Sequence, residues 1–202
     1  NAAYADAYKA FVEQVQQREA ALGKTALSEA VARYLFKLMA YKDEYEVARL
    51  HSDPAFLARI DAMFEGEYSL NYHLAPPLTA KRNDKGELVK KKYGPGMLRN
   101  FRLLARLKGL RGTPLDVFGR TQERRTERAL IAQYRDSIEE VLQTLGSGNH
   151  AQALEIARIP EQIKGYGHVK ERHLQAARAR WAELMTAYRA TVPPADAKRL
   201  LA

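Results

Sequence analysis

The chain of 202 residues contains no cysteine, which excludes disulfide bridges, thiolate zinc sites and cysteine-ligated iron–sulfur clusters within it. It also lacks a run of about 18 apolar residues, so no segment is predicted to cross a bilayer. The first residues, Asn1-Ala2-Ala3, do not form a secretory signal, and there is no initiator methionine. We therefore expect an excised piece of a longer protein with a cytoplasmic location and no membrane partner.

Most of the chain repeats its apolar residues every three or four positions, which predicts amphipathic helices. Asp43 precedes Glu46 at the spacing of a capping box, and Asp53-Pro54 is a helix-start signal. No internal repeat or low-complexity linker interrupts the pattern. The chain is therefore predicted to be mainly α, with residues 1–202 forming a single helical domain. Helices are predicted near 3–22, 28–48, 53–66, 97–107, 121–145, 149–158 and 168–190.

The segment 68–96 departs from the helical pattern. Leu70, Tyr72 and Leu74 alternate with polar residues, which is the period of a strand. A turn signal at 83–86 separates this stretch from a second possible strand over 88–93. A short β-hairpin-like insertion is therefore predicted within the helical domain.

The positive charge is concentrated in one segment. The chain carries 33 Lys and Arg against 24 Asp and Glu, a net charge of +9. Eleven of the cations lie between Lys81 and Arg111, opposed only by Asp84 and Glu87, so this segment alone accounts for +9. Such a patch attracts an anionic partner or, alternatively, only keeps an exposed hairpin soluble and protects its edge.

Six cations are the candidate anion-binding or partner-binding residues. Three lie at helical spacing within the basic segment, two lie four apart at the start of a later helix, and one begins the last long helix. For the later pair the alternative is a solvated face paired with Glu123 and Glu127. The candidates are Arg99, Arg102, Arg106, Arg124, Arg128 and Lys170.

No metal site is predicted. His168 and His173 are five residues apart on a predicted helix and point away from each other, whereas histidine ligands on one face need a spacing of three or four. Gly165-Tyr166-Gly167 neither follows a strand nor continues into a dinucleotide-binding loop. No nucleophile–base arrangement or phosphate-binding loop is present, so no catalytic residue is assigned.

Four runs of residues carry a resemblance to a known family. They are Tyr41-Lys42-Asp43-Glu44-Tyr45-Glu46-Val47-Ala48-Arg49-Leu50-His51, Tyr72-His73-Leu74-Ala75-Pro76-Pro77, Leu107-Lys108-Gly109-Leu110-Arg111-Gly112-Thr113 and Gly165-Tyr166-Gly167-His168-Val169-Lys170-Glu171. Because these four runs occur in the same order and at the same spacing, the chain closely resembles the C-terminal helical domain of bacterial fused indolepyruvate ferredoxin oxidoreductases. The resemblance extends from about Arg33 to Tyr188.

The resemblance implies a parent enzyme that oxidatively decarboxylates aryl 2-oxo acids to acyl-CoA and passes the electrons to ferredoxin. It implies thiamine diphosphate, Mg²⁺, coenzyme A and iron–sulfur clusters for that parent. The Gly-Asp-Gly and paired asparagines that bind thiamine diphosphate are absent here, so the fragment is predicted to hold no cofactor and to be inactive alone.

Two classes of function remain open at this point. The first is a structural or docking domain whose partners are the other domains of the oxidoreductase, its coenzyme A or its ferredoxin. The second is a free-standing basic helical module that binds nucleic acid, for which the basic segment offers only Tyr93 and Phe101 as stacking aromatics. The family resemblance favours the first.

Overall fold

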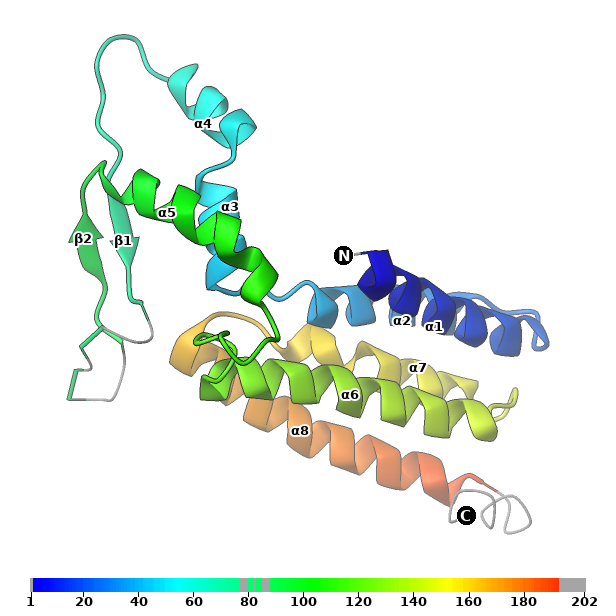
Figure 1. Ribbon diagram of the computed structural model, residues 1–202. Helices are drawn as coiled ribbons and strands as arrows, with labels where there is room; N and C mark the ends of the chain where they lie inside the picture. Colours follow the sequence, from blue (N-terminus) through cyan, green and yellow to red (C-terminus); the bar gives the residue numbers. More distant parts are fainter. Residues whose placement is uncertain (1, 77–79, 82, 85–87, 193–202) are drawn as a thin grey trace. The chain divides into compact units, whose positions relative to one another are not determined.

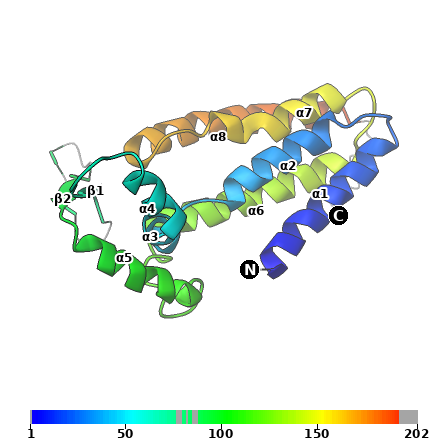
Figure 2. The ribbon, with the colours of Figure 1, turned by 90° about the horizontal axis from the view of Figure 1, so that it is seen from above.

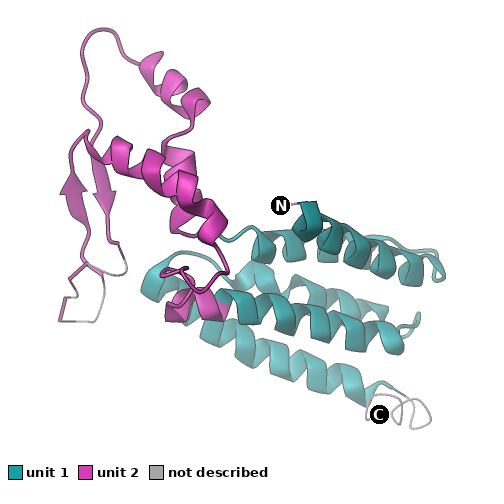
Figure 3. Cartoon of the chain, viewed as in Figure 1, with its two compact units in different colours: residues 1–41, 127–202 teal, residues 42–126 magenta. Residues whose placement is uncertain are grey.

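The mainly helical prediction is confirmed by the computed structural model, which describes residues 2–76, 80–81, 83–84 and 88–192. These residues form eight α-helices, two short 3-10 helices and one two-stranded sheet (Figure 1). The contacts divide the chain into two compact units (Figure 3). Unit 1 contains residues 1–41 and 127–202, and unit 2 contains residues 42–126. No boundary was predicted from sequence, because no linker composition marks it.

Unit 1 is a helical bundle (Figures 1 and 2). Tyr134 and Trp181 are both buried in its apolar core. The two rings pack edge to face at 6.0 Å. The Tyr134 hydroxyl donates to the Ala157 carbonyl at 2.9 Å, and the Trp181 indole donates to Ser137 Oγ at 3.1 Å. The elements are α1 (Ala2–Ala20), α2 (Ala26–Met39), most of α6 (Gln122–Gln143), α7 (His150–Arg158), η2 (Ile159–Gln162) and α8 (Gly167–Ala190).

A fully buried carboxylate connects three helices of unit 1. Glu19 of α1 accepts hydrogen bonds from the backbone N–H groups of Leu27 and Ser28, both at 2.7 Å, in the first turn of α2. His150, the first residue of α7, places its Nε2 atom 2.6 Å from the same carboxylate. Glu19 therefore satisfies helix-end donors that the N-cap residue Thr25 leaves unbonded.

Unit 2 packs two helices and a hairpin around a small apolar cluster. Its elements are α3 (Glu44–His51), α4 (Pro54–Asp61), β1 (Tyr72–Leu74), β2 (Lys91–Tyr93), α5 (Met97–Arg106) and η1 (Leu107–Leu110). The predicted hairpin is confirmed, with β1 and β2 antiparallel and Tyr72 opposite Tyr93. Residues 85–87 of the predicted turn lie outside the described residues, as do Arg82 and Lys85 of the basic segment.

Two aspartates begin the first two helices of unit 2. The Asp43 carboxylate accepts the N–H of Glu46 at 2.9 Å, so the apolar stripe predicted over 28–48 divides into α2 and α3. Asp53 accepts the N–H groups of Ala55 and Phe56, as its position before Pro54 predicts. Local capping therefore sets the direction in which α3 and α4 begin.

Candidate docking surface on helix α5

Helix α5 is amphipathic, and its outward face combines arginines with leucines. Phe101 is buried, and Met97, Leu104 and Ala105 are partly buried against the unit 2 cluster. The opposite face is exposed and continues into the first residue of η1. We call this face the α5 surface; it consists of Arg99, Arg102, Leu103, Arg106 and Leu107.

No carboxylate in this part of the sequence opposes the three arginines. Residues 88–111 contain no Asp or Glu, and all of them lie within the described part of the chain. Arg99, Arg102 and Arg106 are exposed and form no ion pair or side-chain hydrogen bond with any residue that the structure describes. The nearby lysines Lys91 and Lys92 of β2 are also exposed. The α5 surface is therefore positively charged and available to an anionic group.

An aromatic cluster fixes α5 on α3 and β1. The His51 ring stacks on the Phe101 ring with centroids 5.0 Å apart and an interplanar angle of 15°. Tyr72 packs edge to face against both, at 5.5 Å from His51 and 5.1 Å from Phe101. Ala48 of α3 is fully buried in the same cluster. Because the inward side of α5 is held at Phe101, its outward side is presented on a rigid support.

A polar network holds the segment that follows α5. Arg111 donates through Nε and Nη2 to both carboxylate oxygens of Asp43, at 2.5 and 2.8 Å. The buried Asp116 accepts the N–H groups of Gly112 and Gly119 at 2.8 and 2.9 Å and the Tyr45 hydroxyl at 3.3 Å. A Cβ on Gly119 would overlap the Asp116 carboxylate, so a larger residue here would displace that carboxylate from its hydrogen bonds.

The stability of unit 2 is expected to fall as the pH decreases from about 7 to about 5, the range in which histidine titrates. Burial lowers the pKa of His51 below its value in the unfolded chain. The unfolded state then binds a proton more readily, so the His51 contribution is complete above the unfolded pKa and is lost as the pH falls. Amide hydrogen exchange in α3 and α5 measures the loss, and an NMR titration measures the His51 pKa directly. His51→Gln should flatten this part of the pH profile; an unchanged profile would contradict the assignment.

Arg124 lies inside unit 2, and Arg128 is exposed. Arg124 is 7% exposed, and its Nη1 atom donates to the Lys42 carbonyl at 3.3 Å. Its guanidinium also lies 3.7 Å from the Glu44 carboxylate and 3.6 Å from that of Glu123. The two arginines therefore do not form a joint exposed site. Arg124 is not on a solvated face either, because its guanidinium is buried beside Glu44 and Glu123.

Lys170 is engaged within unit 1. Its ammonium group donates to the carboxylate of Glu127, which is 6% exposed. Gly165 comes shortly before Lys170 in the chain and has a φ of +88°. A Cβ at Gly165 would clash with Val169, because it would lie 2.8 Å from Val169 Cγ1. The Gly165–Gly167 turn leaves Tyr166 81% exposed at the start of α8. The turn thus presents an aromatic side chain, and the predicted anion site at Lys170 is occupied by Glu127.

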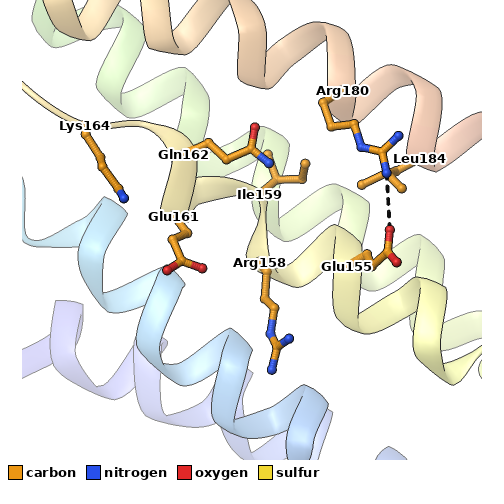
Figure 4. Close-up of a pocket in the computed structure, with 8 residues that line it drawn as sticks. All are labelled: Glu155, Arg158, Ile159, Glu161, Gln162, Lys164, Arg180 and Leu184. Carbon is orange, nitrogen blue, oxygen red and sulfur yellow. Dashed lines mark hydrogen bonds and ion pairs between the residues drawn. The ribbon is translucent and has the colours of Figure 1, made fainter.

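A shallow depression of about 370 Å³ lies on unit 1 between η2 and α8 (Figure 4). Most of the side chains around it are charged, and Arg180 bridges to Glu155 at 3.4 Å. Glu161 is also engaged, because its Oε2 atom accepts the Tyr34 hydroxyl at 2.8 Å. This open, internally paired surface does not have the enclosed apolar lining of a small-molecule site.

The sequence contains no thiolate for an iron–sulfur cluster, and among the described residues no group of three or more His, Asp or Glu is placed to hold a metal ion. No helix in the described ranges is both long and apolar enough to cross a membrane.

A model of a family of unknown function, DUF6537, matches residues 1–183. The chain belongs to the DUF6537 family. The match includes all of unit 2 and reaches into the second half of α8, so both units are part of the DUF6537 sequence pattern. No curated protein and no solved structure matches this DUF6537 chain.

Residues from three of the four runs quoted above meet inside unit 2 of this DUF6537 chain. The first supplies Asp43, Tyr45 and His51, the second supplies Tyr72, and the third supplies Arg111. The carboxylate–guanidinium pair and the aromatic contacts described above join them directly. These runs therefore build the support of α5 and contribute only Leu107 to its outward face.

Sequence reasoning did not assign a role to the two leucines of the α5 surface. Leu103 is 60% exposed and Leu107 is 42% exposed, although an apolar residue on a predicted helix is usually assigned to the core. Their spacing from Arg99, four and eight residues, is the signal that places them on the arginine face.

Proposed function

We propose that this DUF6537 chain is a non-catalytic docking domain of an indolepyruvate-type oxidoreductase that oxidises aryl 2-oxo acids and reduces ferredoxin. The α5 surface is the observation that carries the docking role: three exposed arginines, unpaired among the described residues, lie on a helix that aromatic packing fixes in place. The four family-like runs support the parentage. A cytoplasmic location follows from that parentage and is part of the proposal.

The alternative function, nucleic-acid binding, gains no support from the aromatic residues of the basic segment. Phe101 is 4% exposed and lies in the unit 2 cluster, and Tyr93 is partly buried against the same cluster. Single-stranded nucleic acids bind to grooves in which exposed aromatic rings stack on the bases. Both rings are used for internal packing instead.

The test is charge reversal in the full-length enzyme that contains this domain. Arg99→Glu, Arg102→Glu and Arg106→Glu are combined, and arylpyruvate-dependent ferredoxin reduction is measured over a range of ferredoxin and coenzyme A concentrations. We expect a tenfold or larger rise in the KM for one of the two, about 1.4 kcal/mol, because the variant replaces attraction with repulsion. A rise for ferredoxin identifies a protein partner, and a rise for coenzyme A identifies its phosphates. A fall in kcat alone points to docking between domains of the enzyme.

The matched control reverses three exposed arginines of unit 1 that also form no ion pair within the described part of the chain: Arg33, Arg172 and Arg178. It has the same change in net charge and should leave all the kinetic constants within about twofold, as expected for surface changes away from the site. Equal effects of the two triple variants would refute a docking role for α5. A full-length protein without arylpyruvate-dependent ferredoxin reduction would refute the parentage.

A further inference from the structure

The α5 surface has the arrangement of a protein-binding site rather than that of a simple cationic patch. Its five residues occupy positions i, i+3, i+4, i+7 and i+8 counted from Arg99, so they form one stripe along α5 and the start of η1. Leu103 lies between Arg102 and Arg106 in the sequence, and Leu107 follows Arg106. Charged and apolar groups thus share one exposed face.

The arginines specify a carboxylate-rich partner. Each guanidinium presents a planar set of donors that matches a carboxylate bidentately, as Arg111 does with Asp43 inside this same unit. Arg99, Arg102 and Arg106 have no such carboxylate within the described chain. An acidic surface would supply the missing anions and would be attracted over a distance by the basic segment.

The leucines indicate that this acidic partner is a protein. Leu103 and Leu107 are 60% and 42% exposed, so each has apolar area that a partner can cover. The phosphates of a nucleic acid or of coenzyme A gain nothing from these side chains, whereas protein interfaces combine an apolar centre with a polar rim. Arginine is also enriched among the residues that dominate binding energy at protein interfaces.

We propose that the α5 surface binds an acidic protein face that has apolar side chains at its centre. The arginines pair with the carboxylates of that face and govern the rate and salt dependence of association. The leucines pack on its apolar centre and set how long the complex lasts. This proposal rests on the docking role proposed above and adds the chemistry of the partner.

The experiment measures binding of labelled synthetic peptides to the 202-residue chain by fluorescence anisotropy. One helical peptide carries leucines every three or four positions among glutamates; the second has serines in place of those leucines and the same charge. We expect the leucine peptide to bind about tenfold more tightly or better, since covering one leucine is worth about that factor. Combining Leu103→Ser with Leu107→Ser should remove this preference and leave the salt dependence unchanged.

Two further variants and two further probes decide the outcome. The triple Arg99→Glu, Arg102→Glu, Arg106→Glu variant should bind neither peptide, while the Arg33, Arg172 and Arg178 control should bind as the wild type does. Circular dichroism confirms that each variant is folded. Equal binding of the two peptides, no binding of either, or tighter binding of a single-stranded RNA or of anionic phosphatidylserine vesicles would overturn the proposal. These results do not depend on the assay of the full-length enzyme, so the two proposals can fail separately.

Discussion

Glu19→Ala is expected to lower the free energy of unfolding of unit 1 by about 3–5 kcal/mol, the usual cost of removing one partner from a buried pair. The Glu19 carboxylate is completely buried and accepts three hydrogen bonds, from Leu27 N–H, Ser28 N–H and His150. The variant leaves two backbone donors and an imidazole buried without this acceptor. Urea unfolding followed by the fluorescence of Trp181, the only tryptophan in the chain, measures the effect within unit 1.

The pH dependence gives this prediction a second readout. Burial raises the pKa of Glu19, but the hydrogen bonds from His150, Ser28 and Leu27 outweigh it, and the pKa is lowered overall. The contribution of Glu19 to the free energy of unfolding is therefore present above its pKa in the unfolded chain and is lost as the pH falls through its pKa in the folded chain.

Glu13→Ala is the control, because Glu13 lies on the same helix with its side chain 52% exposed and only a 3.7 Å contact to Lys9. If Glu19→Ala lowered the free energy of unfolding no more than Glu13→Ala does, the role of Glu19 in capping the start of α2 would be contradicted.

Phe101→Ala should destabilise unit 2 by about 3–5 kcal/mol, the range for removing a buried phenylalanine from a core. Phe101 is 4% exposed and contacts the rings of both His51 and Tyr72, so the cavity would form where α5, α3 and β1 meet. Since unit 2 has a much smaller cluster than unit 1, few other contacts are available to compensate. Amide hydrogen exchange of residues 97–106 measures the destabilisation, and Trp181 fluorescence should report little change at low urea.

The same helix provides the control. Leu103→Ala removes an apolar side chain that is 60% exposed, so the stability of unit 2 should change by about 0.5 kcal/mol or less. If Leu103→Ala destabilised unit 2 as strongly as Phe101→Ala, the orientation of α5 described here would be wrong. If the orientation is right, Phe101→Ala should also weaken peptide binding, because the α5 surface loses its rigid support.

The elements that depend on neighbouring residues could be predicted without the structure. The three- and four-residue period predicted the helices, and the alternation around Tyr72 predicted the hairpin. Asp43 and Asp53 marked helix starts because an N-cap bonds to N–H groups two or three residues ahead. The arginine row of α5 could be predicted as well, since Arg99, Arg102 and Arg106 share a face in any regular helix.

Which of the predicted surfaces remain exposed depends on contacts between residues that are distant in the sequence. Arg124 has the same type of local sequence as an exposed arginine, but Lys42 and Glu44, some 80 residues away along the chain, enclose it. Glu19 caps a helix that begins several residues after it, and its partner His150 is 131 positions distant. Leu103 is exposed because it lies on the face of α5 opposite the one that packs in the unit 2 cluster. Periodicity reports which residues share a face, but pairing between distant residues and the choice of the buried face depend on how the whole unit packs.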